Sequence, residues 1–154
     1  MYYEIFQRIK EKVRELVSFQ TFAFGDLLRR IPPPEELNTF LPAFVLEPTD
    51  IDFEFLSAQK DVLEERIRWQ LHYLTRWTGK EEDLSERLEL MNKLIPKILE
   101  LENERLNNKK IRIVSFSITR TFDLELIREA PQFSDLSGIT LEFETKIIKE
   151  VKYG

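Results

Sequence analysis

Apolar residues near the start of the chain recur every three or four positions, with charged residues between them. This spacing predicts an amphipathic helix, because such residues share one helix face. A longer stripe of the same period begins after Asp83, the expected N-cap, which has a glutamate three residues later. We expect Pro96 to kink this second helix and Asn107–Asn108 to end it. The two stripes are Ile5, Phe6, Ile9, Val13, Leu16 and Val17, and then Leu84, Leu88, Met91, Leu94, Ile95, Ile98, Leu99 and Leu106.

Between and after these helices, apolar residues alternate with polar ones, which is typical of half-buried strands. The short apolar segment 43–46, bounded by Pro48, predicts a buried strand. Both faces of the strand that begins at Ile111 are partly apolar, so we expect a β-bulge near Ile113. The alternation predicts further strands over 51–55, 65–77, 111–122 and 139–147.

The order of these elements is helix, three strands, helix, two strands. It predicts an α+β fold with a mixed or antiparallel sheet of about five strands and two main helices packed on one face. With 154 residues, the chain fits one domain, 1–154. No run of about 18 apolar residues occurs, so we expect no membrane-spanning helix.

Residues 19–41 have no clear period and contain three consecutive prolines, which predicts a long irregular connection. Phenylalanine is concentrated in and around this segment. One interpretation is that the connection folds back over the core. The other is that its aromatic side chains stay exposed and bind a partner subunit. The interface candidates are Phe19, Phe22, Phe24, Phe40 and, later in the chain, Phe133.

Composition removes several kinds of site. The chain has no cysteine, which excludes disulfides, thiolate catalysis and zinc fingers. Its one histidine, His72, excludes sites that need two imidazoles. Four scattered glycines form no phosphate-binding loop. The formal net charge of −5 argues against broad nucleic-acid binding. We therefore expect no cofactor.

Three groups of residues still suggest chemistry. Asp135 followed by Glu144 and Lys146 resembles the PD-(D/E)xK nuclease signature, in which two carboxylates bind Mg²⁺. Its proline, Pro131, lies four residues before the aspartate rather than next to it, and an E-x-K pair also occurs on ordinary polar strand faces. His72 with a carboxylate and a serine would form a triad, the alternative being a solvated histidine.

The third group is Asp50, Asp52 and Glu54, which share one face of one strand. Their carboxylates have the oxygen ligands that Mg²⁺ or Ca²⁺ prefers. The same alternation occurs on a strand face that is simply exposed to water, and on an edge strand whose charges prevent pairing with other strands. Both interpretations stay open beside the metal site.

The chain also resembles a known family, the small neck proteins of long-tailed bacteriophages, comprising tail terminator and tail-to-head joining proteins. The resemblance covers nearly the whole chain and lies in the order of its elements, while the connection 19–41 departs from the usual plan. The similar segments are the N-terminal helix, Leu41–Val45, the Arg66–Leu71 strand, the helix from Asp83 and the closing hairpin Ser117–Asp123 to Leu136–Phe143.

The resemblance implies a structural protein rather than an enzyme. The expected assembly is a homo-oligomer, a hexameric ring in the virion neck that forms in the host bacterial cytoplasm. Its expected partners are the tail tube protein and a head-completion or connector protein, with DNA passing through without specific binding. Side chains facing such a channel should repel phosphates. The candidates for this lining are Asp50, Asp52, Glu54, Glu142 and Glu144.

Two other functions remain open from the sequence. A cellular α+β scaffolding or binding domain that forms oligomers would have the same pattern, and so would a metal-dependent nuclease of the PD-(D/E)xK kind.

Overall fold

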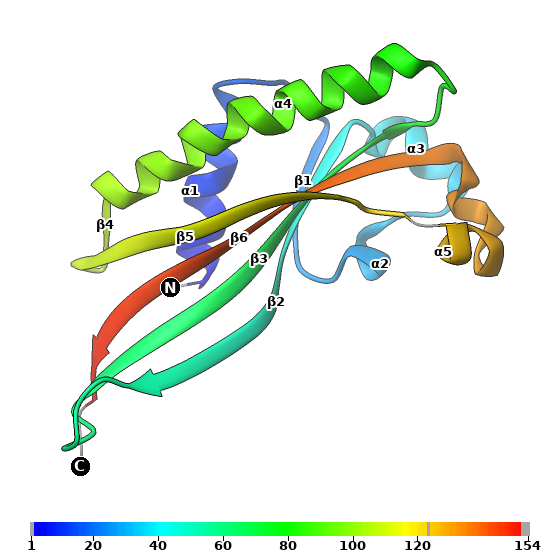
Figure 1. Cartoon of the computed structure of the whole chain (residues 1–154). Coiled ribbons are helices and arrows are strands. Elements are labelled where there is room, and N and C mark those ends of the chain that lie inside the picture. The colour runs from blue at the N-terminus through cyan, green and yellow to red at the C-terminus, as the bar shows by residue number, and fades with distance from the viewer. Residues whose placement is uncertain (1, 123, 152–154) are drawn as a thin grey trace.

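The computed structural model describes residues 2–122 and 124–151, and these form one six-stranded sheet with helices on both faces (Figure 1). The strand order is β1-β2-β3-β6-β5-β4, with β1 parallel to β2 and all other neighbours antiparallel. The elements are α1 (Tyr2–Arg14), β1 (Thr21–Phe24), α2 (Leu27–Arg30), η1 (Pro34–Glu36), α3 (Leu37–Phe40), β2 (Ala43–Phe55), β3 (Val62–Arg76), α4 (Glu81–Leu99), η2 (Glu100–Asn103), β4 (Arg105–Leu106), β5 (Lys109–Arg120), α5 (Leu124–Glu129), η3 (Pro131–Asp135) and β6 (Leu136–Glu150).

The mixed sheet confirms the predicted α+β class, with six strands where about five were expected. The two long helices, α1 and α4, pack on one face of this sheet, also as predicted. Their apolar stripes meet the inward residues of the four long strands, and Trp69 lies fully buried at the centre. Other members of this core are Ile5, Ile9, Phe44, Met91, Leu94, Leu141 and Phe143.

Polar contacts fix the position of α1. The Tyr2 hydroxyl donates to the buried Glu65 carboxylate over 2.7 Å, and Lys149 lies 2.9 Å from the same carboxylate. This hydrogen bond, burial and the charge of Glu65 together raise the pKa of Tyr2 to about 12. At the other end of α1, Lys12 lies 2.6 Å from Glu104.

The connection 19–41 is not irregular, which corrects the sequence prediction. It contains β1, α2, η1 and α3, and β1 pairs in parallel with the first four residues of β2. The short helices cover one end of the second sheet face. There a smaller core joins Leu27 and Leu37 to Val45, Leu74 and Leu136. The helices of the molecule therefore lie on both faces of the sheet, the two main ones on one of them.

The segments 43–46 and 51–55, expected as separate strands around Pro48, are one continuous strand. A register shift between Pro48 and Asp50 absorbs the proline. Pro48 lies beyond the residues that pair with β1, so its missing N–H removes no sheet hydrogen bond on that side.

The second helix also differs from its expected bounds. It begins at Glu81 with Lys80 as N-cap, so Asp83 lies inside its first turn. It ends at Leu99, and Asn107 and Asn108 instead form the tight turn between β4 and β5. Both have positive φ, 51° and 60°, as a two-residue hairpin turn requires. The predicted bulge in β5 is confirmed by a register shift between 113 and 116.

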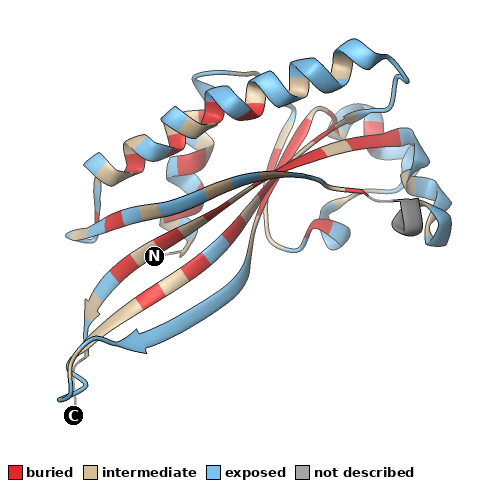
Figure 2. Cartoon of the chain, viewed as in Figure 1, coloured by how far each residue is buried: buried red, intermediate tan, exposed pale blue. Residues whose placement is uncertain are grey.

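Figure 1 shows the hairpin end of β2 and β3, together with β6, extending away from α4. Along this extension buried residues of β3 and β6 recur at alternate positions between intermediate or exposed ones, while the end of β2 is exposed throughout (Figure 2). Within the described ranges, no helix has the length and apolar character needed to cross a membrane.

Candidate functional site

The phenylalanines expected at an interface pack within the subunit. Phe22 is buried, and its ring lies 5.5 Å from those of Phe6 and Phe44. Phe19 and Phe24 are partly buried against the same core. These contacts match the interpretation in which the connection folds back over the core.

Phe40 and Phe133 have a similar position on the opposite face. Both are partly buried against the smaller core, and the ring of Phe133 lies 5.5 Å from that of Phe122. All five candidates are therefore occupied, at least in part, by contacts within their own chain.

The exposed phenylalanines among the described residues lie elsewhere, on the free half of β2. Among the described residues, β1 pairs with β2 only at 43–46, so the outer edge of 47–55 has no neighbouring strand. Ile51, Phe53 and Phe55 project from the same face as the core but beyond the helices that cover it. Phe53 is 56% exposed and Phe55 is 49% exposed. Sequence reasoning placed these residues on a half-buried strand and did not predict how far their side chains are exposed.

A second free edge lies on the other side of the sheet, along β5. In the part of the chain that the structure describes, β4 pairs only with Lys109 and Lys110. No further strand among the described residues pairs with the outer edge of 111–120, but the Ile113 amide donates to the Glu102 side chain over 3.2 Å, so the open part of this edge begins after Ile113. Its apolar side chains include the exposed Val114 and the partly buried Ile113, Phe116 and Ile118.

The five acidic channel candidates lie on one face of the sheet, opposite α1 and α4, but they do not lie there alone. Register aligns Asp50 with Arg68 and Glu144 across three strands. In the next row, Asp52 aligns with Arg66, Lys146 and Arg112. Arg66 also lies 3.2 Å from Glu54. Acidic and basic side chains therefore lie next to one another on this face, which is not uniformly acidic.

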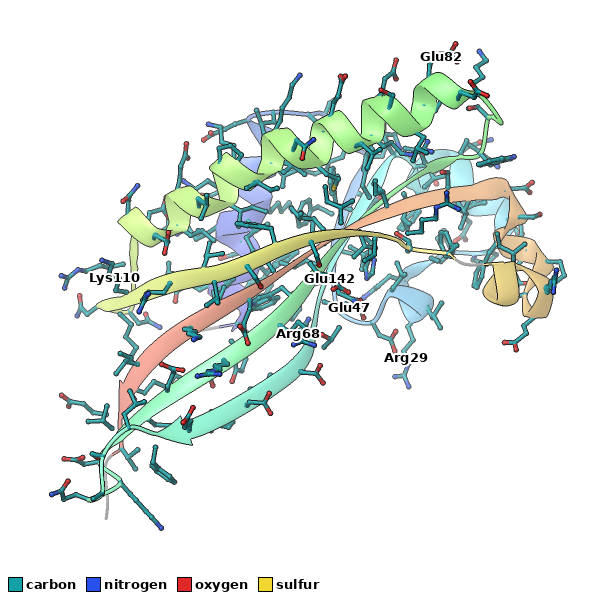
Figure 3. The ribbon with its side chains drawn as sticks, in the orientation of Figure 1. Arg29, Glu47, Arg68, Glu82, Lys110 and Glu142 are labelled. Carbon is teal, nitrogen blue, oxygen red and sulfur yellow. The ribbon has the colours of Figure 1, made fainter. Side chains whose placement is uncertain are left out.

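Figure 3 shows Glu47, Arg68 and Glu142 on this charged face, on the side of the sheet away from α4. Glu142 accepts hydrogen bonds from Gln70 over 2.7 Å and from Ser117 over 3.3 Å. A small hollow of about 170 Å³ lies beside Glu142, and Arg68, Ser117 and Glu144 are among the residues that line it.

His72 is buried rather than solvated, which corrects the expectation from its polar strand face. Its Nε2 lies 2.7 Å from Glu47, and its Nδ1 lies 2.6 Å from the hydroxyl of Thr140. An ionised Glu47 only accepts, so the Nε2–H of His72 donates to it, and in this tautomer of the neutral ring the Thr140 hydroxyl donates to Nδ1. Thr140 in turn contacts Thr121 over 2.8 Å. The imidazole in this hydroxyl–imidazole–carboxylate chain is only 4% exposed, while the Glu47 side chain at its end is partly exposed.

Glu47 links this chain to α2, because its other oxygen accepts from the amide of Leu27 over 3.2 Å. Burial raises the pKa of the Glu47 carboxyl, but the hydrogen bonds from His72 and Leu27 outweigh burial. The pKa therefore lies below its ordinary value of 4.5. The network fastens α2 to the charged face.

Replacing Glu47 with glutamine should lower the free energy of unfolding by about 1–3 kcal/mol at neutral pH, because a neutral amide cannot accept both hydrogen bonds. The folded pKa is depressed, so the ionised carboxylate stabilises the fold fully above the unfolded pKa. That contribution is lost as pH falls through the folded pKa. Denaturation of both proteins at neutral pH and at pH 3 should show the difference shrinking in acid. A difference that is constant or grows in acid would contradict this role.

The nuclease signature does not assemble. Asp135 lies in η3, where its carbonyl accepts from Trp77 at the end of β3. Glu144 lies eight strand residues beyond Leu136, a separation of about 27 Å. Glu144 and Lys146 do share a face, as expected. Nowhere in 2–122 and 124–151 do three or more His, Cys, Asp or Glu side chains gather as a metal site would require, and Asp50 and Glu54 instead lie near arginines.

No protein-family model matches the chain, and no curated protein matches it in sequence.

Proposed function

We propose that the chain is a structural virion protein of a long-tailed phage, a ring-forming tail terminator or head-to-tail joining protein. It caps the tail tube and connects it to the head. The observation that carries this proposal is the free edge of β2 with its exposed Ile51, Phe53 and Phe55. Large exposed apolar side chains in a row mark a surface that binds another protein.

Chemistry elsewhere in the described residues supports an assembly role over catalysis. His72 is buried in a hydrogen-bonded network, and Asp135 lies far from Glu144. The order of elements that resembles the neck proteins agrees with this choice, and it implies a ring of six subunits that contact the tail tube and a connector protein.

The charged face suits the wall of a channel that DNA crosses. Asp50, Asp52, Glu54, Glu142 and Glu144 lie on this one face, and the nearby basic side chains lie beside them. Arginines that are paired with carboxylates release few counterions from DNA, so the face should not hold phosphates. In the proposed ring this face lines the lumen, and α1 and α4 face outward.

We expect the purified protein to show negligible affinity for duplex DNA at low salt, measured by fluorescence anisotropy. A variant with Arg66→Glu and Arg68→Glu should behave identically, because the wild-type arginines are already paired. Changing Asp50, Asp52 and Glu54 together to lysine should create measurable, salt-sensitive binding. Tight binding by the wild-type protein would contradict the non-binding channel.

The neck function is tested by deleting the gene in the phage genome that encodes the chain. Electron microscopy of the lysate should show filled heads separated from tails, with tails of uncontrolled length if the ring terminates them. Expression of the protein from a plasmid should restore joined particles. Normal virions from the deletion would contradict the proposal and favour a scaffolding role outside the particle.

A further inference from the structure

The outer edge of β2 has no neighbouring strand among the described residues from Thr49 to Phe55, and every residue of this stretch is exposed (Figure 2). We propose that this edge binds an extended segment of another protein, which joins the sheet as an antiparallel strand and alternates apolar with basic residues. This inference rests on the proposed function, because it specifies how the β2 edge binds a partner in the assembly.

The direction of the backbone groups at this edge follows from the hydrogen bonding of β2 with β3. The Leu56 amide donates to the Val62 carbonyl over 2.9 Å, so these two residues form a hydrogen-bonded pair at the end of the ladder. Such pairs alternate with non-hydrogen-bonded pairs in an antiparallel ladder. Residues 50, 52 and 54 therefore bond to β3, while residues 51, 53 and 55 turn their N–H and C=O groups outward, away from β3.

The opposite side of β3 gives the same result. The Val151 amide donates to the Asp61 carbonyl over 2.9 Å, so the β3–β6 register assigns the odd-numbered residues of β3 to β6. The even-numbered residues of β3 are left for β2, and they align with residues 50, 52 and 54. Residues 51, 53 and 55 thus offer outward N–H and C=O groups, which are the groups that strand addition uses.

The side chains of these three outward residues form an apolar row. Ile51 is 39% exposed, Phe53 is 56% exposed and Phe55 is 49% exposed. Residues of an added antiparallel strand that lie directly opposite them have their side chains on the same face. Apolar residues at those positions of the partner would cover the row and remove it from water.

The other face of the edge is acidic. Asp50, Asp52 and Glu54 are exposed, and the arginines beside them, Arg66 and Arg68, belong to the inner neighbour β3. The outer side of each carboxylate therefore faces the position of the added strand. Basic residues there, between the apolar ones, would set opposite charges side by side on neighbouring strands, which stabilises their pairing.

The strands of this chain are poor candidates for the segment. Within the described strands, basic and apolar residues alternate at 66–69 and 110–113. β3 has neighbours on both sides, and the outer edge of 110–113 is occupied by β4 and by the side chain of Glu102, which accepts from the Ile113 amide. A second β2 edge would set carboxylates against carboxylates. The segment therefore belongs to a different protein.

A synthetic peptide tests the strand addition on the wild-type protein. The probe is a labelled, end-capped peptide in which valine and lysine alternate over the length of residues 49–55, and fluorescence anisotropy should detect its binding. A peptide with glutamate in place of each lysine should bind roughly 10-fold more weakly. No binding of the lysine peptide, or equal affinities of the two peptides, would overturn the stated partner chemistry.

Methylated peptides test the backbone pairing. In an antiparallel strand whose valines lie opposite residues 51, 53 and 55, only the valine amides face β2. N-methylation of the valines should therefore abolish binding, whereas N-methylation of the lysines should leave it unchanged. Equal affinities of the two methylated peptides would overturn the pairing.

Two variants at residue 53 test the same pairing from the side of the protein. Phe53→Ala and Phe53→Pro both remove the ring, but only proline removes the outward N–H, which no bond to β3 uses. The proline variant should bind the peptide roughly 10-fold more weakly than the alanine variant. Equal binding by the two would contradict a role for this amide. Thermal melting verifies that both are folded.

Charge reversal tests the acidic face. Asp52→Lys with Glu54→Lys should weaken binding of the lysine peptide roughly 10-fold, because attraction becomes repulsion. The matched control is Glu82→Lys with Glu89→Lys on α4, which makes the same change of net charge away from the edge and should bind like wild type. Equal weakening in the control would show that net charge, rather than the edge, attracts the peptide.

Native mass spectrometry of Phe53→Pro tests a second copy as the occupant of the edge. We expect this variant to assemble like wild type. A variant that is monomeric where wild type is oligomeric would assign the edge to a second copy and overturn the inference. The gene deletion tests the proposed function separately. Normal virions together with peptide binding would refute only that function, and separated heads and tails without peptide binding would refute only the strand addition.

Discussion

Replacing Phe44 with alanine should lower the free energy of unfolding by about 3–5 kcal/mol, the usual range for a buried phenylalanine. Phe44 is fully buried, and its ring lies 4.7 Å from that of Tyr73 and within 6 Å of Phe19 and Phe22. Its removal opens a cavity between β1, β2 and β3. Chemical denaturation of both proteins measures the change.

Phe53→Ala is the matched control, since it makes the same substitution on the same strand. Phe53 is exposed, so the monomer should change by about 0.5 kcal/mol or less. The experiment is run at a dilution where the subunits are separate. Equal losses for the two variants would contradict the distinction between a core residue and an edge residue on β2.

Gly138→Ala should lower the free energy of unfolding by about 3 kcal/mol through overpacking. A methyl group at this position of β6 would lie 2.6 Å from Cβ of Thr121 and 3.1 Å from Leu74. The nearest neighbour is the base of a side chain rather than its flexible end, so it cannot move aside cheaply.

The variant with both Gly138→Ala and Thr121→Gly checks this cause. Removing the Thr121 side chain frees the space, so the double variant should be more stable than the sum of the two single effects predicts. Additive losses would show that the close approach is not responsible. Melting temperatures of all four proteins complete the cycle.

Local periodicity was sufficient for the long elements of this fold. The apolar stripes of α1 and α4 and the alternation of β3 and β6 each extend over several turns or residue pairs, so their type could be predicted from the sequence. The bulge in β5 was also predicted, because a change of phase in an alternating pattern is a local signal.

Elements defined by distant partners could not be predicted in this way. β1 has four residues, and it is a strand because it pairs with residues 22 positions later. Pro48 suggested a break, yet it lies where β2 has no outer neighbour and a register shift accommodates it. Asn107–Asn108 suit a helix end and a hairpin turn equally, and pairing of β4 with β5 selects the turn.

The same reason explains the candidate site. Alternation placed Asp52 and Glu144 each on the polar face of its own strand. That Asp52 lies beside Arg66, and Glu144 beside Arg68, depends on strand order and register, which alternation does not give. The abundance of phenylalanine in 19–41 fitted both a segment folded over the core and an exposed surface, and the described phenylalanines that are exposed are Phe53 and Phe55. The order of strands in a sheet decides which strand edges lack a neighbour. The number of phenylalanines in a segment does not reveal that order.

Self-assembly is the central claim, and the mass of the wild-type particle across a concentration series tests it most directly. Native mass spectrometry and sedimentation velocity should show one closed oligomer with a fixed number of subunits, six in the proposed ring, that dissociates to monomers only on dilution. A protein that stays monomeric to high micromolar concentration would contradict the account.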